Sequence, residues 1–244
     1  MRTIVPPGLS ATLVLVRHGE STWIVRNRFQ GRRNPWLSAR GRLQAAAVAR
    51  RLADPFALPP LPVPPGRPVA IWHSPLKRAS DTARAIGALI PAAELIADER
   101  LVEISQGEWE GRSHRSVAAL GPGLAEWRTD PIRANAPGGE PLGAARRRVR
   151  AALDGILSRL AAPTPGASAA QPWGIVVAHG GALRVATLLL LGFPVSRFWA
   201  IPFETCAITV IELTDGHGIL RAHNLQAHLA GLIKEAEVDR GGAL

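Results

Sequence analysis

Two apolar runs in the sequence each end in a histidine followed by glycine. The run "TLVLV" (12–16) leads into Arg17 and His18, and the run "WGIVVA" (173–178) leads into His179. Such runs predict buried strands, so each imidazole should lie at the carboxyl end of a strand. The glycines let the backbone turn sharply and let a ligand approach its N–H groups. Because an arginine beside a histidine is unfavourable unless an anion binds both, this pattern indicates an anion site.

A third cation follows a third predicted strand. Arg78 stands near the start of a helix expected over 74–90, just after a strand expected over 69–73. Arginine offers a rigid fork of donors to phosphate oxygens, and helix N-termini also attract phosphate. Together with Arg17 and the two histidines, Arg78 therefore completes a pocket suited to a tetrahedral anion.

The imidazole of His18 has the chemistry of a phosphoryl acceptor. Neutral histidine is a competent nucleophile that forms covalent intermediates, and nearby cations lower its pKa and keep it neutral. The leaving alcohol then needs a proton, which a carboxylic acid near the pocket can supply. We expect that acid to be Glu103, which lies between two apolar residues in "LVEISQGEWEG". Glu108 is the alternative, with Glu110 behind it.

Strand and helix signals alternate along most of the chain. Ser38 is the expected N-cap of one helix, and Ser74 is that of another, with Pro75 at its first position. Helices are predicted at 38–53, 74–90, 141–162 and 182–192, and strands at 12–16, 69–73, 173–178, 206–213 and 218–224. Strands separated by helices favour a three-layer α/β/α sandwich with a mostly parallel central sheet. Ligands bind such sheets at the carboxyl ends of the strands, where the two histidines stand.

The remaining segments carry few regular signals. The proline-rich residues 54–68 are expected to form a loop, residues 94–104 a short extended region, and residues 163–172 a linker. Between residues 112 and 140 the signals become short and broken. We expect a single domain over 1–244, with a lid-like inserted segment at about 105–140.

Composition excludes several classes of protein. Hydrophobic residues make up 47% of the chain and charged residues 20%, a balance typical of a globular protein. No apolar run is long enough for a membrane helix, and no signal-peptide pattern opens the sequence, so a cytoplasmic protein without a membrane partner is expected. The only cysteine, Cys206, allows no internal disulfide and is expected to be a buried thiol.

The net charge of +10 comes almost entirely from arginine. A basic chain can bind nucleic acid, but these arginines are scattered, without a clustered stripe or interleaved aromatic residues. The densest run, "RRRVR" at 146–150, is expected to form the solvated side of a helix. We therefore expect no nucleic-acid partner.

In its motifs the chain resembles the histidine phosphatase superfamily, which includes the cofactor-dependent phosphoglycerate mutases. The signature is "LVRHGEST" (15–22). The further matches, in chain order, are "RFQG" (28–31), "GRLQA" (41–45), "SPLKRASDTA" (74–83), "EISQGEWEG" (103–111), "PGGE" (137–140), "VVAHGGALR" (176–184) and "HNLQAHL" (223–229). They span most of the chain, and their combination is far more specific than a lone "RHG".

This resemblance implies a phosphoglycerate mutase-like fold and a phosphomonoester hydrolase of the histidine acid phosphatase type. It implies that His18 becomes phosphorylated and that Glu103 donates the proton. The catalytic residues it assigns are His18, Glu103, His179, Arg17 and Arg78, and the substrate-binding residues are Gln30, Gly31, Asn27 and Gly180. It implies no metal and no other cofactor, with a small phosphorylated metabolite as the partner. A homodimer is left open.

The chain departs from the family pattern at two positions. Ile24 stands where the family often has an asparagine that helps to hold phosphate, and Asn34 stands where an aspartate is common. Asn27 is close to Ile24 but matches a different position. These departures bear on substrate affinity more than on the basic chemistry.

The segment 112–140 favours a phosphatase over a mutase. Family mutases carry a longer segment with an Arg-Arg-Ser stretch followed by prolines, which this chain lacks, and "GEWEG" and "PGGE" are more similar to the phosphatase branch. Two alternatives stay open, a cofactor-dependent phosphoglycerate mutase and a degenerate member that binds phosphate esters without turnover. The sequence does not identify the phosphomonoester.

Overall fold

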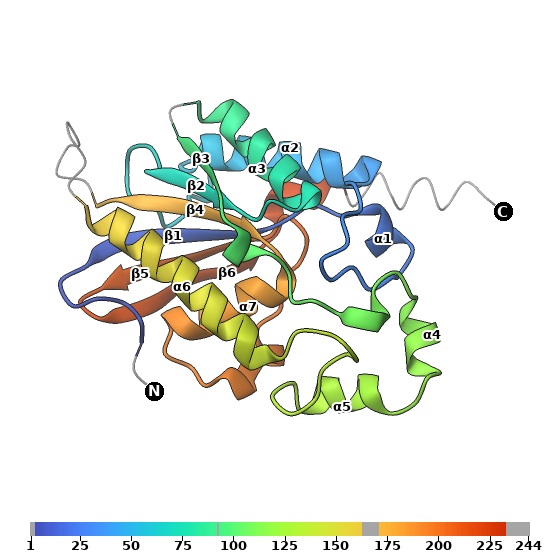
Figure 1. Ribbon diagram of the computed structural model, residues 1–244. Coiled ribbons are helices and arrows are strands. Elements are labelled where there is room, and N and C mark those ends of the chain that lie inside the picture. The colour runs from blue at the N-terminus through green and yellow to red at the C-terminus, as the bar shows by residue number, and fades with distance from the viewer. Residues whose placement is uncertain (1–2, 92, 163–170, 233–244) are drawn as a thin grey trace.

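A six-stranded sheet with the order β3-β2-β4-β1-β5-β6 forms the centre of the molecule (Figure 1). The computed structural model describes residues 3–91, 93–162 and 171–232. The strands are β1 (Ser10–Arg17), β2 (Ala70–His73), β3 (Glu94–Ala97), β4 (Trp173–Ala178), β5 (Ile208–Thr214) and β6 (His217–Leu225). The first four strands in the sheet order are parallel, and β5 pairs antiparallel with both β1 and β6. The predicted mostly parallel sheet is confirmed.

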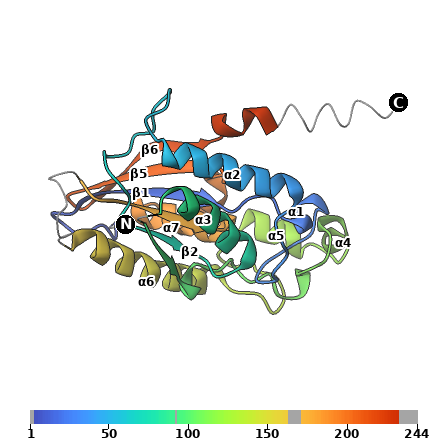
Figure 2. The same cartoon turned by 90° about the horizontal axis from the view of Figure 1, so that it is seen from above.

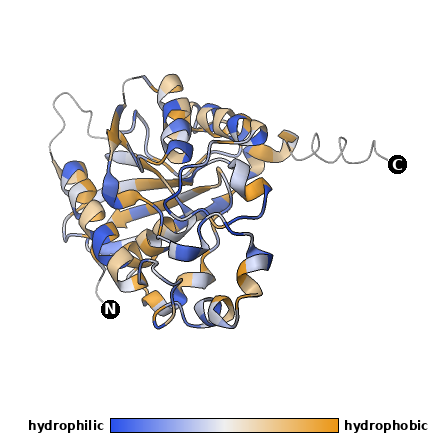
Figure 3. Cartoon of the chain, turned by 45° about the vertical axis from the view of Figure 1, so that its right-hand side comes forward, coloured by the Kyte–Doolittle hydropathy of each residue, from blue (hydrophilic) through white to orange (hydrophobic). Residues whose placement is uncertain are grey.

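Helices cover both faces of this sheet, which gives the predicted three layers (Figure 2). One face carries α2 (Ala39–Ala53) and α3 (Lys77–Leu89), and the other carries α6 (Leu142–Ala161) and α7 (Gly180–Leu190). Each face of the sheet packs against its helices in a separate hydrophobic core, and alternate residues of β1 belong to the two cores. Leu13 and Leu15 pack on the α6 side, while Val14 and Val16 pack on the α2 side. Figure 3 shows the resulting hydrophobic colouring along the strands between the helices. Each such buried side chain contributes about 1.5–3 kcal/mol to folding.

A third group of short elements lies beyond the ends of β1 and β4 (Figure 1). It contains α1 (Thr22–Val25), α4 (His114–Ala118) and α5 (Gly123–Thr129). Its own small core consists of Phe29, Trp109, Val117, Leu124 and Ala136, with Trp127 packed against it. The broken signals predicted for residues 112–140 are therefore confirmed as two short helices, and the lid role of the segment stays a prediction.

Short 3₁₀ turns complete the described elements. They are Glu99–Leu101, Gly107–Trp109, Val195–Ala200 and Ala227–Leu229. The expected extended region at 94–104 is thus only in part a strand. No helix among the described residues is long and apolar enough to cross a membrane. Most of the expected linker at 163–172 lies outside the described residues.

Two predicted helix starts are wrong. Helix α3 begins at Lys77 rather than at 74, because the Ser74 hydroxyl is engaged with His179 and the chain stays extended up to Leu76. The cap comes instead from a distant loop, where the Asn34 Oδ1 accepts a hydrogen bond from the Lys77 N–H at 2.7 Å. Helix α7 begins at Gly180, two residues earlier than expected, so the glycines after His179 belong to its first turn.

Candidate active site

The two histidines meet at the ends of β1 and β4. The rings of His18 and His179 lie 5.1 Å apart between centroids in an edge-on arrangement, and both side chains are buried. The Nδ1 of His18 lies 2.7 Å from the Gly19 carbonyl oxygen. Since a carbonyl oxygen only accepts, Nδ1 carries the proton, and Nε2 keeps the lone pair that a nucleophile needs.

Arg78 is fixed by hydrogen bonds from every branch of its guanidinium group. The Nε donates to His18 Nε2 at 3.1 Å, Nη1 donates to the Arg33 carbonyl at 2.8 Å, and Nη2 donates to the Gly31 carbonyl at 2.9 Å. The side chain is only 1% exposed. These hydrogen bonds and the burial of Arg78 fix the position of its guanidinium relative to the Nε2 of His18.

Two buried polar atoms in the cluster have no partner among the described residues. Arg17 donates from Nη1 to the Phe203 carbonyl at 2.6 Å, but its Nε makes no hydrogen bond. His179 pairs through Nε2 with the Ser74 hydroxyl at 2.7 Å, while its Nδ1 is unpaired. Because buried polar groups are nearly always satisfied, such atoms beside His18 indicate a ligand site.

Burial and positive charge keep both imidazoles neutral. Burial is the main reason that the pKa of His18 lies well below 6.5, and the guanidinium groups of Arg78 and Arg17 lower it further. The pKa of His179 is lowered in the same way, first by burial and then by the charge of Arg78. Burial also lowers the pKa of Arg78 to about 10, which still leaves it charged at neutral pH. The pocket therefore combines a neutral nucleophile with cationic anion binders.

Glu103 enters the pocket from the irregular segment that follows β3. Its Oε2 accepts from the Gly181 N–H at 3.1 Å, and its Oε1 accepts from the Ala182 N–H at 3.2 Å, so the carboxylate lies on the first turn of α7. Glu103 is half-buried, while its rival Glu108 is exposed. The structure thus brings Glu103, and not Glu108, to the same helix turn that follows His179.

Glycine is required at the start of α7 for space. A Cβ on Gly181 would lie 2.5 Å from the Glu103 Oε1 and 2.9 Å from the Ile104 side chain. A Cβ on Gly180 would meet nothing closer than 3.6 Å, the distance to the Arg17 Nε. The chain turns from β4 into α7 across His179 alone, as expected, but neither glycine has a positive φ, so close approach is the physical reason for Gly181.

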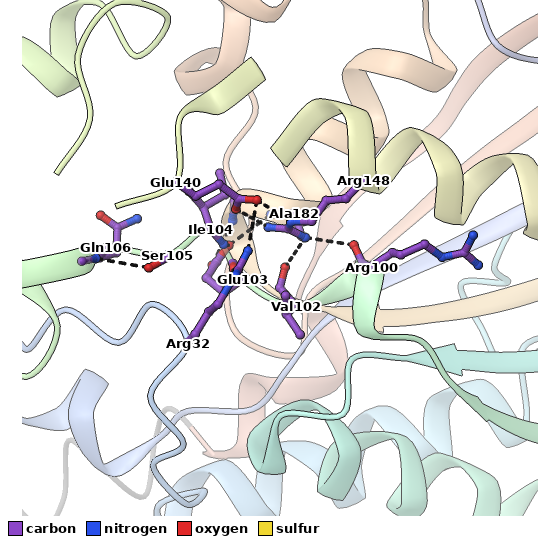
Figure 4. Close-up of polar contacts among 12 residues, drawn as sticks. Arg32, Arg100, Val102, Glu103, Ile104, Ser105, Gln106, Glu140, Arg148 and Ala182 are labelled. Atoms are coloured by element: carbon purple, nitrogen blue, oxygen red, sulfur yellow. Dashed lines mark hydrogen bonds and ion pairs between the residues drawn. The ribbon is translucent and has the colours of Figure 1, made fainter. Parts of the chain in front are cut away.

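A network of ion pairs supports the segment that carries Glu103 (Figure 4). Glu140 of the "PGGE" motif accepts two hydrogen bonds from Arg148, at 2.8 and 2.7 Å. Arg148 also donates to the Val102 carbonyl at 2.7 Å, and Arg32 joins Glu140 at 3.0 Å and the Glu103 carbonyl at 3.3 Å. Two arginines around one carboxylate therefore hold the backbone on both sides of the Glu103 side chain.

The charge state of Glu140 reflects this network. Burial alone would raise the pKa of Glu140, but the hydrogen bond and charge of Arg148, with those of Arg32, outweigh it and hold the pKa below its usual range. The prediction that "RRRVR" forms a solvated helix side is wrong for Arg148, whose side chain is only 15% exposed. The sequence signal that could have found it is the acidic end of "PGGE", a partner eight residues earlier.

The predicted substrate-side residues fall into two groups. The Gly31 carbonyl holds Arg78, and Gly180 lies against Arg17, so both adjoin the cluster. The Gln30 Oε1 accepts from the Ser21 hydroxyl at 2.6 Å. Asn27 is exposed in a turn with a φ of 50°, and no described contact joins its side chain to the cluster.

Glu110 ties the loop around Gly31 to the segment after Glu103. Its Oε1 accepts from the Arg32 N–H at 3.0 Å and from the Gln106 N–H at 3.0 Å. The sequence offered Glu110 only as an alternative acid behind Glu108, whereas in the structure its carboxylate supports the pocket wall. Across the described ranges, no group of three or more His, Cys, Asp or Glu residues could hold a metal ion.

Comparison with known proteins points to one family. The model of the histidine phosphatase superfamily (branch 1) matches residues 13–226. The chain is 31% identical over 225 residues to phosphoserine phosphatase 1 of Hydrogenobacter thermophilus, which covers 92% of this chain and 97% of that protein. It is 33% identical over 193 residues to glucosyl-3-phosphoglycerate phosphatase of Mycobacterium tuberculosis, which covers 78% of this chain and 79% of that one. The solved structure of mycobacterial glucosyl-3-phosphoglycerate phosphatase with VO3 matches at a TM-score of 0.74 and 28% identity, over 88% of this chain and 100% of that chain.

The three-layer fold and the strand-end cluster define an α/β enzyme of phosphoryl transfer. The chain belongs to the histidine phosphatase superfamily, which confirms the resemblance seen in its motifs. It is a phosphomonoester hydrolase that works through a phosphohistidine intermediate, as the phosphatases among its relatives indicate. Neither the mutase nor the non-catalytic alternative is favoured by these relatives.

Proposed function

We propose that His18 is the residue that becomes phosphorylated and that Glu103 is the proton donor. The observation that carries this proposal is the convergence of Arg78, His179 and Arg17 around His18: Arg78 donates to Nε2, the His179 ring lies 5.1 Å away, and the charges of both arginines act on the imidazole. Two guanidinium groups and a second imidazole can surround three phosphoryl oxygens. The neutral Nε2 is then placed to act as the nucleophile.

In the first step, His18 Nε2 attacks phosphorus and the bond between phosphorus and the ester oxygen breaks. The Arg78 Nε–H, which donates to Nε2 in the free site, donates to a phosphoryl oxygen once Nε2 is bonded to phosphorus, while Nη1 and Nη2 stay on the Arg33 and Gly31 carbonyls. The leaving alkoxide takes the proton of the Glu103 carboxylic acid, so the products are an alcohol, a carboxylate and phosphohistidine. The cations stabilise the charge that collects on the equatorial oxygens.

In the second step, water attacks phosphorus and the bond between phosphorus and Nε2 breaks. The Glu103 carboxylate accepts a proton from this water, which returns it to the acid form. Inorganic phosphate leaves and His18 is neutral again. Because Glu103 is half-buried rather than enclosed, water reaches the side of the pocket where this step needs it.

The same roles favour a histidine acid phosphatase type of enzyme, with its highest activity at acidic pH. Proton donation needs the acid form of Glu103. The lowered pKa of His18 keeps the nucleophile neutral into the same acidic range. A pH profile of kcat tests this proposal, and a maximum above neutral pH would contradict it.

For the substrate we propose a small phosphorylated metabolite, a phosphate monoester of a three-carbon carboxylic acid. Phosphoserine and glucosyl-3-phosphoglycerate, named for two of the relatives, are both such esters, with the carboxylate at C1 and the phosphate at C3. Phosphorylated metabolites of this kind are made inside cells, which supports a cytoplasmic site of action. Cell fractionation of the native host tests that location.

Trapping of the phosphoenzyme tests the proposed roles. The protein is mixed with p-nitrophenyl phosphate, quenched in base and analysed by mass spectrometry for an acid-labile phosphate on His18. We expect the adduct in the parent and its absence in His18→Ala, with hydrolysis reduced by at least ~10⁴-fold. His217→Ala, at an exposed position, is the matched control and should retain both signals. Unchanged hydrolysis in His18→Ala would rule the assignment out.

A further inference from the structure

Arg184 is a charged residue of the pocket wall to which the chemistry above gives no role. It lies in the second turn of α7, and its side chain runs back toward the start of the helix, as helical side chains do. Its Nε donates to the Ile201 carbonyl at 2.9 Å. The guanidinium carbon lies 5.0 Å from the Trp199 ring centroid and 5.5 Å from that of Phe198. The hydrogen bond to Ile201 holds the Nε edge of the Arg184 guanidinium, and the two aromatic rings lie near the group.

The other edge of this guanidinium faces the phosphoryl cluster. A Cβ on Gly180 would lie 3.8 Å from the Arg184 Nη1 and 3.6 Å from the Arg17 Nε. The two guanidinium groups therefore flank the same short stretch of backbone, immediately after His179. The side chain of Arg184 is half-buried rather than enclosed.

No described carboxylate forms an ion pair with Arg184. Its terminal nitrogens make no hydrogen bond to any described residue, and no acidic oxygen lies within 4.0 Å. Glu103 and Glu204 are the acidic groups that attract it, but Glu103 is engaged with the N–H groups of α7 and Glu204 is exposed. Arg17 faces it as a like charge. A second anion beside the first would relieve this repulsion.

A phosphoryl group accounts for only two of the three arginines in this pocket. Its oxygens need Arg17 and Arg78 on the two sides of His18. The Arg184 Nη1 and the Arg17 Nε both lie beside Gly180, since a Cβ there would lie 3.8 Å from the first and 3.6 Å from the second. A group attached to a phosphate held by Arg17 can therefore reach Arg184. A fork of two free N–H donors with a planar group behind it suits a carboxylate, which it can bind through two parallel hydrogen bonds.

We propose that Arg184 binds the carboxylate of the substrate and thereby selects phosphate esters of carboxylic acids. This inference rests on the proposed phosphatase function and assigns its specificity to one residue. The Ile201 carbonyl and the Trp199 ring hold the guanidinium in place before the substrate arrives. Preorganisation of this kind raises affinity without a new cost in side-chain entropy.

Two pairs of substrates that differ in the carboxylate alone test the proposal. Phosphoserine is compared with O-phosphoethanolamine, and 3-phosphoglycerate with glycerol 3-phosphate. The parent should prefer the carboxylate member of each pair. In Arg184→Gln, kcat/KM for the carboxylate members should fall roughly 10- to 100-fold, as expected for a lost hydrogen bond to a charged group, mostly through KM. For the partners without the carboxylate the change should stay within about threefold.

Control variants separate binding from structure. Arg184→Lys keeps the charge without the fork and should fall between the parent and Arg184→Gln. Arg84→Gln, at an exposed position on α3, removes one positive charge elsewhere and should leave both pairs unchanged. An equal loss on both members of a pair in Arg184→Gln would make Arg184 a structural support of the Ile201 turn and overturn the proposal.

The failure of this proposal is distinguishable from failure of the proposed function. If the parent hydrolyses p-nitrophenyl phosphate through His18 but shows no preference within either pair, the carboxylate site is wrong and the phosphatase assignment stands. If the parent forms no phosphohistidine with any of these esters, the proposed function itself is wrong.

Discussion

The pocket has two unlike sides. On the nucleophile side, His18, Arg78 and His179 come from the ends of β1, the start of α3 and the end of β4, and none is more than 1% exposed. On the donor side, Glu103 comes from an irregular segment, is half-buried, and is held by a helix turn and by the ion pairs around Glu140. The nucleophile side is thus fixed by the core, and the donor side by polar contacts between loops.

This difference matches what each side has to do. A neutral imidazole among cations needs burial, because burial and charge together hold the proton off Nε2. The donor must exchange protons with the substrate and with water, so it needs partial exposure together with a fixed position. Because the core supports one side and polar contacts between loops support the other, a substitution can weaken one side without the other.

The largest effect is expected from Arg78→Met on the nucleophile side. It removes the donor to His18 Nε2 and a phosphoryl-binding fork, so kcat/KM should fall about 10²- to 10³-fold. It also removes a positive charge that lowers the His18 pKa, so that pKa rises toward 6.5 and the acidic limb of the kcat/KM profile moves to higher pH. Stopped assays from pH 4 to 8 measure both. If kcat/KM fell but the acidic limb of its pH profile stayed in place, the charge of Arg78 would not be a cause of the lowered pKa of His18.

The second effect is expected from Arg148→Met on the donor side. This change leaves Glu140 with Arg32 as its only ion-pair partner and frees the Val102 carbonyl. Breaking such a pair should lower the free energy of unfolding by about 2–4 kcal/mol. It should also lower kcat through looser placement of Glu103, while leaving the acidic limb of His18 in place.

Removing the charge of Glu140 as well separates the loss of stability in Arg148→Met from its loss in kcat. With Glu140→Gln added, much of the stability should return, because no uncompensated carboxylate remains. The loss in kcat should persist, since the Val102 carbonyl is still unsupported. Urea unfolding and steady-state kinetics on the parent and the two variants distinguish these outcomes. Full recovery of kcat in the double variant would assign the effect to charge and not to placement.

The same two sides differ in how far the sequence predicted them. The nucleophile side was predictable because apolar runs ending in His-Gly mark strand ends, and strand ends of a parallel sheet meet at one edge. The donor side was predictable only for Glu103 itself. Its supports, Arg148 and Glu110, act across loops, and no local pattern reveals which distant backbone group an arginine or glutamate will reach.

Helix boundaries failed for a related reason. Ser74 and Pro75 form a good local start for a helix, but tertiary contact overrides it: the Ser74 hydroxyl pairs with His179 and Asn34 caps Lys77 from a separate loop. The asparagine that departs from the family pattern at position 34 therefore has a structural role, since its side-chain oxygen serves that cap. Sequence spacing cannot show a cap that comes from another part of the chain.

The third prediction uses two neighbouring glycines as a matched pair. Gly181→Ala places a Cβ 2.5 Å from the Glu103 Oε1 and should push the carboxylate off the helix turn, with a loss in kcat of about 10- to 100-fold. Gly180→Ala has 3.6 Å of space, and both changes favour helix propensity equally. Gly180→Ala should therefore keep most of the activity. Equal losses in the two variants would show that the close approach of Gly181 to Glu103 does not matter.

The smallest expected effect is on the pH dependence of the free energy of unfolding, which differs between the two sides of the pocket. The pKa of His179 is lowered by burial and by Arg78, so below about pH 6.5 the unfolded chain binds the proton that the folded chain does not. Stability should thus fall as the pH drops from 6.5, by at most about 1.4 kcal/mol per pH unit for this histidine. In His179→Asn that slope should flatten, whereas His217→Asn, at an exposed position, should keep the slope of the parent.

Glu140 on the donor side acts in a different window. Its pKa is lowered in the folded state, so its contribution is complete above the ordinary value of 4.5 and is lost only as the pH falls below that value. Burial also lowers the pKa of His114, His223 and His228, so unfolding at pH 7.5, 6.0 and 5.0 reports on all these histidines. The difference between the parent and His179→Asn isolates the nucleophile side in this window, and measurements from pH 5.0 to 3.5 add Glu140 on the donor side. If Glu140→Gln flattened the upper window as well, the two sides would share one electrostatic network, and the division between core-fixed and loop-fixed support would fail.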